Sequence, residues 1–478
     1  MKNLGRFIKI ISANPRFRRR FLLSQLFLIG MVLFSLIIPQ MIQTIVDEGI
    51  LQQDLERIVN IALRMVLFAF ISAILQILNA GFAVGFSVRV AHGLRVRLYE
   101  KIQSLSFGNL DRFQTSDLLV RMTSDVNIIK QMVMLVTAFL LMAPVMLIGS
   151  VVLIYITTPQ LMWIMVVILI IMTIILVVYS LKARTFFRAM QEKLDNLNGV
   201  LQENLAGVRV VKAFVREAYE INRFDQRNED LKDAAKKPML LTAFLVPSFL
   251  LVITLGTASV LWFGGNLSIT TGSISVGEIM TFSNYLVMAM VPLALVAFVL
   301  PQVAASDASL ERIFVVMDSE PDVQDKAEAH SLPEITGRVT FENVSMSYLD
   351  DDGNPTGRYV LKNINLTAEP GQMVAILGAT GSGKSSLIHL IPRFYDVTEG
   401  RVAIDGVDVR DVKMADLRQH ISIALQQAIL FSGTIRENIR YGNPSADQDQ
   451  IIEVATAADA HGFVSAQVDG YDAAVARE

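Results

Sequence analysis

Long runs of apolar residues alternate with short polar segments over the first 305 residues of the chain. Six runs reach the roughly 20 residues that a helix needs to cross about 30 Å of hydrocarbon. They lie at about 21–46, 58–86, 131–157, 160–181, 241–263 and 279–304. We therefore predict an all-α, six-helix transmembrane domain over residues 1–305, embedded in the lipid bilayer. The first run is too long for the apolar core of a cleavable signal peptide, so we expect it to stay in the membrane.

The connections between these runs differ in charge. Lysine and arginine are concentrated before the first run and in two long connections, whereas the other connections are acidic or carry no lysine or arginine. The basic segments are 1–20, 87–130 and 182–240, and the others are 47–57, 157–160 and 264–277. Because cytoplasmic loops carry an excess of lysine and arginine, the alternation predicts that both termini are cytoplasmic.

Two of the runs continue as helical sequence well beyond the membrane. Residues 160–198 contain no glycine or proline, so one helix of ~58 Å is expected at 1.5 Å per residue. Residues 58–105 allow the same, although Gly81, Gly85 and Gly93 weaken a helix there. The bilayer needs about half of this length, so the rest is predicted to form rigid cytoplasmic extensions. The alternative is a pair of amphipathic helices that lie on the membrane surface.

Composition excludes several classes of site. Hydrophobic residues make up 53% and charged residues 18% of the 478 residues, against about 45–50% and 25% in soluble domains. The formal net charge of −3 gives no reason to expect nucleic acid as a partner. The chain has no cysteine, so disulfides, thiolate zinc sites and a cysteine nucleophile are excluded. The five histidines match no metal-ligand spacing.

A linker segment separates the predicted membrane domain from a second domain. Residues 308–317 have apolar positions at helical spacing, and the polar stretch 318–337, with Pro321 and Pro333, interrupts that pattern. We predict a linker over residues 306–337 and a different domain over residues 338–478.

The motif that carries chemistry is a glycine-rich loop at Gly378-Ala-Thr-Gly-Ser-Gly-Lys-Ser385, which matches G-x-x-x-x-G-K-[ST]. The apolar run 373–377 before it suits a buried strand, and residues 385–394 after it suit a helix. Glycines without Cβ atoms let the backbone approach phosphate oxygens closely and point its N–H groups at them. A strand, a glycine loop and a helix in this order therefore predict a site for a nucleotide phosphate.

Individual roles follow from the chemistry of this loop. Lys384 is expected to reach the β and γ phosphates of ATP, and the Ser385 hydroxyl to bind Mg²⁺. We predict that the nucleotide contacts every residue of the loop and the serine after it, namely Gly378, Ala379, Thr380, Gly381, Ser382, Gly383, Lys384, Ser385 and Ser386. The alternative is a glycine loop that binds no nucleotide.

Several stretches together resemble the ABC exporter family, and bacterial multidrug-type half-transporters in particular, over essentially the whole chain. They are GVRVVKAFVREAYE (207–220), FENVSMSY (341–348), GATGSGKSS (378–386), VAIDGVDVRDV (402–412) and LQQAILFSGTIRENI (425–439). The resemblance implies an α/β P-loop ATP-binding domain after the membrane domain and a location in the bacterial plasma membrane. It also implies a second half-transporter as partner, in a homodimer or a heterodimer.

The resemblance assigns further residues. Tyr348 resembles the aromatic that stacks on adenine, and a packing residue of a strand is the alternative. Gln426 resembles the glutamine that contacts Mg²⁺ and the attacking water, with a shift to Gln427 as the alternative, because Leu425 stands where the family usually has proline. Segments 207–214 and 109–118 resemble the two coupling helices at the tips of the extensions.

The chain departs from the family after these motifs. A Leu-Ser-Gly-Gly-Gln signature, a strand that ends in Asp-Glu and a switch histidine do not occur in the sequence, and residues 470–478 resemble the stretch before that signature. We expect the chain to stop within its ATP-binding domain and to contain no catalytic residue, so that these 478 residues hydrolyse ATP inefficiently. A parallel sheet without its later strands would also leave an open apolar edge.

The function predicted for the intact gene product is export driven by ATP binding and hydrolysis. A nucleotide-gated channel or a non-hydrolysing regulatory subunit is the alternative; a membrane domain fused ahead of the nucleotide domain argues against an importer. The few charges in the spans favour a small apolar or amphipathic cargo. The polar residues within them (Gln25, Gln40, Gln76, Asn79, Asn284 and Gln302) either line a pathway or join helices by hydrogen bonds.

Overall fold

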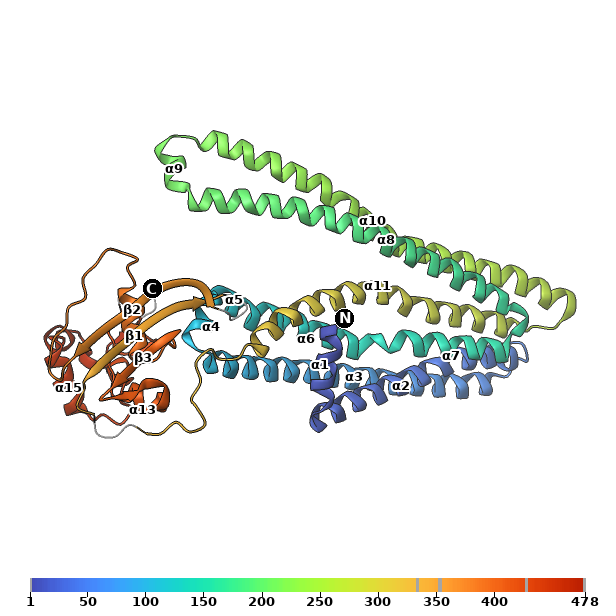
Figure 1. Ribbon diagram of the computed structural model, residues 1–478. Coiled ribbons are helices and arrows are strands. Elements are labelled where there is room, and N and C mark those ends of the chain that lie inside the picture. Colours follow the sequence, from blue (N-terminus) through green and yellow to red (C-terminus); the bar gives the residue numbers. More distant parts are fainter. Residues whose placement is uncertain (1, 332–334, 351–354, 426–428, 476–478) are drawn as a thin grey trace. The chain divides into compact units, whose positions relative to one another are not determined.

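The computed structural model describes residues 2–331, 335–350, 355–425 and 429–475 (Figure 1). The chain forms two compact units. Unit 1 comprises Met1–Leu105 and Asn109–Pro321, and unit 2 comprises Ser106–Gly108 and Asp322–Glu478.

The first two thirds of the chain are helical. The helices are α1 (Lys2–Ser12), α2 (Pro15–Thr44), η1 (Ile45–Ile50), α3 (Leu55–Ser104), α4 (Phe107–Arg112), α5 (Thr115–Val120), η2 (Arg121–Asp125), α6 (Val126–Leu135), η3 (Val136–Leu140), α7 (Met142–Thr157), η4 (Pro159–Leu161), α8 (Met162–Ala206), α9 (Val208–Ala213), α10 (Glu217–Thr271) and α11 (Val276–Asp318).

Six helical segments among the described residues are long and apolar enough to cross a membrane. They are Pro15–Ile50, Leu55–Ser104, Thr115–Thr157, Pro159–Ala206, Glu217–Thr271 and Val276–Leu293. Each predicted span lies within or overlaps one of them, so the prediction of a six-helix membrane domain is confirmed. Helices are suited to this environment because every backbone N–H and C=O within a span is bonded inside the same segment.

Three of these helices are much longer than a bilayer requires. α3 has 50 residues, α8 has 45 and α10 has 55, which corresponds to roughly 68–83 Å at 1.5 Å per residue. The unbroken helix predicted from residue 160 begins at Met162 and continues to Ala206. α8 and α10 run side by side as a hairpin with the short helix α9 at its tip (Figure 1).

Unit 1 contains two apolar clusters. One joins α2, α7, α8, α10 and α11, and its largest fully buried side chains include Phe282 and Tyr285. The other joins α1, α3, α6 and α11 around residues such as Phe86 and Leu98. α11 contributes fully buried residues to both clusters, so it helps to join the two parts of unit 1.

Polar side chains join the spans to one another. The Ser24 hydroxyl donates to Oδ1 of Asn79 at 2.6 Å, and the Gln25 amide donates to the carbonyl of Thr137 at 3.0 Å. Gln302 donates to the carbonyl of Ile128 at 3.4 Å. For Gln25, Asn79 and Gln302, the structure therefore supports hydrogen bonding between helices rather than an open polar pathway.

Unit 2 has a small antiparallel sheet. Its strands β1 (Val339–Leu349), β2 (Pro355–Ala368), β3 (Glu399–Ile404) and β4 (Val407–Asp408) lie in the order β2-β1-β3-β4. A second pair joins β5 (Gly433–Thr434) to β6 (Ala474–Val475). The helical elements are α12 (Lys384–Leu390), η5 (Val409–Asp411), α13 (Met414–Gln419), α14 (Ile435–Arg440), α15 (Gln448–Ala457), α16 (His461–Ser465) and η6 (Gly470–Asp472).

Two expectations for this unit are wrong. The segment Met373–Leu377 forms no strand, and Met373 and Leu377 expose 96% and 92% of their surface. The strands of the described part of unit 2 pair antiparallel, not parallel. The segment 373–377 differs from the prediction because an apolar run becomes a strand only when neighbouring strands accept its hydrogen bonds, and none of the described strands pairs with it.

Asp405 fixes the beginning of β1. Its carboxylate accepts hydrogen bonds from the backbone N–H groups of Thr336, Gly337 and Arg338 and from the Thr336 hydroxyl, at 2.5–3.2 Å. The Thr336 hydroxyl, followed by the three N–H groups, lowers the pKa of Asp405 to about 2. This carboxylate stays ionised in the folded protein over the whole physiological range of pH.

We expect Asp405→Asn to destabilise this edge of the sheet by about 1.5–3 kcal/mol, the range for hydrogen bonds to a charged group. Hydrogen exchange of the β1 amides should accelerate, while the exposed Asp469→Asn should leave it unchanged. Because the folded pKa lies below the unfolded value of about 3.9, the stabilisation is complete above pH ~4 and is lost as the pH falls through about 2. Equal exchange in both variants would contradict this role.

Candidate functional site

The glycine-rich loop connects the exposed segment 373–377 to α12. Gly381 and Gly383 have φ angles of +82° and +86°, a region that glycine adopts without steric cost. A Cβ on Gly383 would lie 2.9 Å from Cδ2 of Leu361, and one on Gly378 would lie 2.8 Å from Oγ of Ser382. The loop conformation therefore favours glycine at Gly381 and Gly383, whereas a side chain at Gly378 would require Ser382 to move.

The backbone of this loop can donate hydrogen bonds to a ligand. Within the described part of the chain, the N–H groups of Gly381 and Gly383 donate to no backbone or side-chain acceptor, whereas the N–H of Ser382 donates to the carbonyl of Ala379 at 3.2 Å. Successive N–H groups in a glycine turn form a concave site for an anion. The loop residues therefore fit a phosphate group.

Lys384 lies at the first position of α12 and folds back over the loop. Its Nζ donates to the carbonyls of Gly378 at 3.0 Å and Ala379 at 2.8 Å. The ammonium group is thus held over the turn and needs only to exchange carbonyl oxygens for phosphate oxygens. Such an exchange is favourable because a hydrogen bond between two charged partners is stronger than one to a neutral carbonyl.

The two serines after Lys384 differ in environment. Ser385 is exposed, whereas Ser386 is buried, and its hydroxyl lies 2.8 Å from the hydroxyl of Tyr348. Ser385 is therefore the serine that is free to bind a metal ion beside a phosphate. Ser386 instead connects α12 to the sheet, so its predicted contact with nucleotide remains untested.

Tyr348 lies near the end of β1 and is brought to the start of α12 by its bond with Ser386. Its ring packs edge-on against Tyr395, with centroids 5.3 Å apart and planes at 87°. The structure therefore places the predicted adenine-stacking residue beside the loop. The packing alternative also has support, because the ring contacts the apolar core of unit 2.

The remaining predicted site residues lie in different surroundings. Ala379, Thr380, Gly381 and Ser382 are exposed on the loop. Gln426 and its alternative Gln427 lie outside the described residues, so the second predicted Mg²⁺ contact is untested. Elsewhere in the described ranges, no group of three or more histidine, aspartate and glutamate side chains could hold a metal ion.

The segments that resemble coupling helices are short helices. Segment 207–214 contains α9, and Phe214 and Val215 after it expose 73% and 80% of their surface. Segment 109–118 contains α4 from residue 109 onward and most of α5. Phe107, the first residue of α4, belongs to unit 2, where its ring stacks on that of Phe394 with ring centroids 3.9 Å apart.

Two arginines that hold the turn after α12 were not predicted. Arg393 is buried and donates to Asp396 at 2.7 Å and to the carbonyl of Gln324 at 3.0 Å. Arg418 donates to the carbonyls of Pro392 and Arg393, and burial, with the charge of Arg393, lowers the pKa of Arg418. The sequence contains no signal for these contacts, because a buried arginine cannot be distinguished from a surface one by residue type.

The family described as ABC transporter transmembrane region matches residues 21–293, and the family described as ABC transporter matches residues 361–473. The chain is similar to an uncharacterized ABC transporter ATP-binding protein, YfiB, of Bacillus subtilis, with 34% identity over 91% of this chain and 74% of the relative.

Two further relatives carry a substrate in their names. An ATP-dependent lipid A-core flippase of Syntrophus aciditrophicus is 34% identical over 91% of this chain and 71% of its own length. A fatty acid ABC transporter ATP-binding/permease protein of Mycobacterium bovis is 35% identical over 80% of this chain and 59% of its own length.

Proposed function

Because the chain belongs to the ABC transporter family, we propose that it is the ATP-binding half-subunit of an exporter for an apolar or amphipathic substrate. ATP binding and hydrolysis would supply the driving force, and the six spans would form half of the pathway. The relatives named for lipid A-core and fatty acid support an amphipathic cargo with a long apolar part.

The observation that carries the proposal is the glycine loop Gly378–Gly383 joined to Lys384. Its free N–H groups, its positive φ angles and the ammonium group over the turn suit a chain of phosphates. Mg²⁺ would be held by Ser385 and Gln426, and the metal would neutralise charge on the phosphates. Tyr348 would contribute its ring to the adenine.

Two half-subunits are proposed to act together as a homodimer or a heterodimer. The support comes from α9 and the turn after it, where the apolar residues Val208, Val210, Phe214 and Val215 are exposed in unit 1. This tip is predicted to lie in the cytoplasm, where contiguous exposed apolar side chains indicate an interaction surface. A partner chain would cover them.

The proposed orientation places both termini in the cytoplasm of a bacterial plasma membrane. Since the sequence has no cysteine, single-cysteine variants report topology directly. In intact cells, we expect a membrane-impermeant maleimide to label Ser273→Cys, in the turn between α10 and α11, and not Ser12→Cys, at the end of α1. Both should react after permeabilisation. Labelling of Ser12→Cys in intact cells would contradict the orientation.

We further propose that these 478 residues bind ATP but hydrolyse it slowly. Hydrolysis requires a positioned water and support for charge around the γ-phosphate, and the sequence contains no match to the motifs that supply these in the family. Steady ATPase activity from the homogeneous polypeptide would contradict this proposal.

Reconstitution tests the function. Because these 478 residues are proposed to hydrolyse ATP slowly, the protein should be placed in vesicles with a co-expressed half-transporter whose sequence contains the missing motifs, and with an amphipathic fluorescent cargo. MgATP-dependent movement of the cargo supports an exporter. Nucleotide binding that opens a passive pathway without turnover would instead favour the nucleotide-gated alternative.

A further inference from the structure

A pocket of about 710 Å³ lies between the beginning of α2 and the second half of α3. Three arginines of α2, Arg16, Arg19 and Arg20, line it together with Arg89 of α3. Arg16, Arg19 and Arg20 share one face of α2, because residues three and four positions apart are neighbours on a helix. Arg20 lies opposite Gly85 of α3, where a Cβ would be 3.7 Å from its guanidinium nitrogen.

Within the part of the chain that the structure describes, these four guanidinium groups have no carboxylate as counter-ion. Among the described residues, none of the four forms an ion pair or a side-chain hydrogen bond, and no aspartate or glutamate lines the pocket. Four like charges around one hollow repel one another, so the arrangement is stabilised by an anion that enters it.

The rest of the pocket is apolar. Leu23 of α2 and Ile77, Leu78 and Phe82 of α3 line it, and Ile77 exposes 71% of its surface. Gly81 adds no side chain, and a Cβ there would meet no atom within 4 Å. A ligand for this pocket therefore combines a negatively charged group with a hydrocarbon portion.

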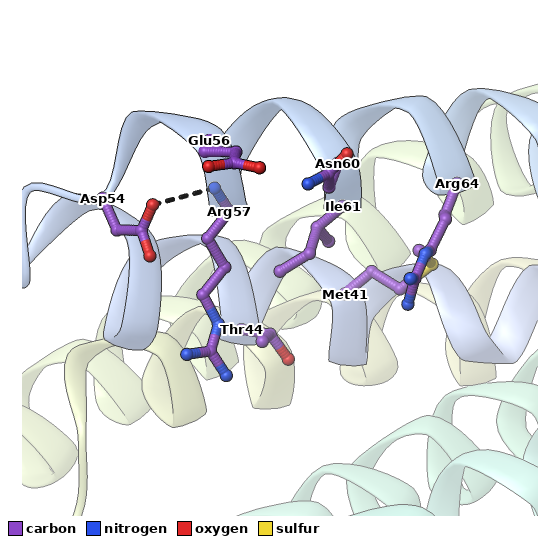
Figure 2. A pocket seen from close by; sticks show the side chains of 8 residues that line it. All are labelled: Met41, Thr44, Asp54, Glu56, Arg57, Asn60, Ile61 and Arg64. Atoms are coloured by element: carbon purple, nitrogen blue, oxygen red, sulfur yellow. Dashed lines mark hydrogen bonds between the residues drawn. The ribbon is translucent and has the colours of Figure 1, made fainter.

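A second charged pocket on the same pair of helices has a different composition. It lies at the opposite ends of α2 and α3, where Arg57 and Arg64 share a face of α3 with Asn60 (Figure 2). There Asp54 and Glu56 line the same hollow, and Arg57 forms an ion pair with Glu48. Its charges are balanced by the protein's own carboxylates, so it gives no comparable reason to expect an anion.

The arginine pocket lies at the membrane boundary. The first apolar run is preceded by Arg16, Arg19 and Arg20, and the second is followed by Arg89. The arginines of both helices therefore lie at the same end of the two spans. Guanidinium groups bind phosphate oxygens in a bidentate manner, and basic pockets between spans on the cytoplasmic side bind phospholipid headgroups.

We propose that this pocket binds an anionic phospholipid of the cytoplasmic leaflet. Its phosphate lies among the four arginines, and one acyl chain lies along Leu78 and Phe82. The assignment to the cytoplasmic leaflet rests on the orientation given under the proposed function. The same phosphate chemistry could come from a free phosphate ester, which the test distinguishes.

The test is native mass spectrometry of the purified chain in detergent, titrated with dioleoylphosphatidylglycerol or dioleoylphosphatidylcholine. We expect one phosphatidylglycerol to bind at least about fivefold more tightly than phosphatidylcholine. Arg19→Gln should weaken phosphatidylglycerol binding about fivefold, the factor that corresponds to ~1 kcal/mol per basic residue near an anionic surface.

Matched variants make the result specific. Arg18→Gln removes the same charge from the same turn of α2, but Arg18 does not line the pocket, so binding should be unchanged. Gly81→Leu keeps every charge and fills the apolar part, so it should weaken binding even if Arg19→Gln fails to fold. Equal binding of the two lipids, equal loss in Arg18→Gln, or no loss in Gly81→Leu would overturn the proposal.

Two further measurements distinguish a lipid from a free phosphate ester and separate the lipid proposal from the proposed function. Glycerol 3-phosphate in millimolar excess should not displace the lipid; full displacement would assign the pocket to a free phosphate ester and overturn the lipid assignment. Nucleotide binding by Arg19→Gln should equal that of the unmodified chain, and the cysteine labelling described above is independent of lipid. A failed lipid test is thereby distinguishable from a failed transporter assignment.

Discussion

Lys384→Ala is expected to weaken the binding of MgATP about 10–100-fold. The ammonium group would lose hydrogen bonds to charged phosphate oxygens, each worth about 1.5–3 kcal/mol, and each 1.4 kcal/mol corresponds to a factor of ten. Lys384 already lies over the turn through its bonds to Gly378 and Ala379, so little rearrangement is needed for it to reach a phosphate. Titration with a fluorescent ATP analogue measures the change.

The dependence on phosphate number separates a direct contact from a structural role. If Lys384 contacts the β and γ phosphates, the variant should lose affinity for ATP and ADP and retain its weak affinity for AMP. If the lysine only holds the loop together, all three nucleotides should lose affinity equally. Lys362→Ala removes one exposed positive charge from β2 of the same unit and should leave all three affinities unchanged.

In a full-length transporter, Lys384→Ala should also abolish transport and ATPase activity together while leaving membrane insertion intact. Insertion depends on the apolar spans, which this substitution does not touch. Transport that survives the change would contradict an ATP-driven mechanism. Vesicle flux and phosphate release, measured on the same preparation, provide the comparison.

The membrane domain was predictable because its signals are local. A span is recognised by a run of about 20 apolar residues, and the six segments found in the structure correspond to the six predicted runs. The long helix α8 was equally predictable, since residues 160–198 lack the two residue types that most often interrupt helices. Neither prediction depended on residues distant in the sequence.

The segment 373–377 shows where local signals fail. Its five apolar residues have the composition of a buried strand, but a strand is defined by the neighbours that pair with it. The described strands pair elsewhere, and the segment is exposed. The glycine loop that follows was recognisable because its positive φ angles favour glycine, so the residue types at 381 and 383 already mark the turn.

Contacts between distant residues were not predictable at all. Asp405 binds the backbone at residues 336–338, about 67–69 positions earlier. The arginine pocket joins Arg19 and Arg20 to Arg89 across two helices. The sequence shows that the arginines are basic and near the membrane, but it does not show that they surround one hollow.

Arg312→Ala is expected to destabilise unit 1 by about 3 kcal/mol, near the lower end of the cost of removing one partner from a buried ion pair. Asp125, in η2, is 1% exposed, and it accepts from Nε of Arg312 at 2.9 Å, from a terminal nitrogen of the same guanidinium and from the Ser309 hydroxyl at 2.9 Å. Without Arg312, the buried carboxylate keeps the Ser309 hydroxyl as its one donor among the described residues. The Arg312 side chain is 49% exposed, so water reaches the vacated space and limits the loss.

Removing the charge of Asp125, the other partner of the pair, should reduce the stability of unit 1 by less. In Asp125→Asn, the half-exposed guanidinium regains water, and the amide oxygen still accepts from Ser309 or Arg312. We expect a loss of about 1.5 kcal/mol, the lower end of the range of about 1.5–3 kcal/mol for a hydrogen bond to a charged group. Thermal unfolding in detergent, followed by the fluorescence of Trp163 and Trp262, reports on unit 1, because both tryptophans lie in its helices α8 and α10. Lys193→Ala, which breaks an exposed ion pair between α8 and α10, should change the midpoint little.

The double variant Asp125→Asn, Arg312→Ala decides between a charge effect and a packing effect. If the cost of Arg312→Ala comes from an uncompensated carboxylate, neutralising Asp125 should restore part of the stability, and the double variant should unfold at a higher temperature than Arg312→Ala. If the arginine acts through its aliphatic stem, the two losses should add.

The pair joins η2 to α11, and α11 ends at Asp318, three residues before the division between the units at Pro321. A charge effect would therefore make this pair one of the contacts that hold the last turns of α11 in unit 1, beside the ion pair between Arg6 of α1 and Asp318.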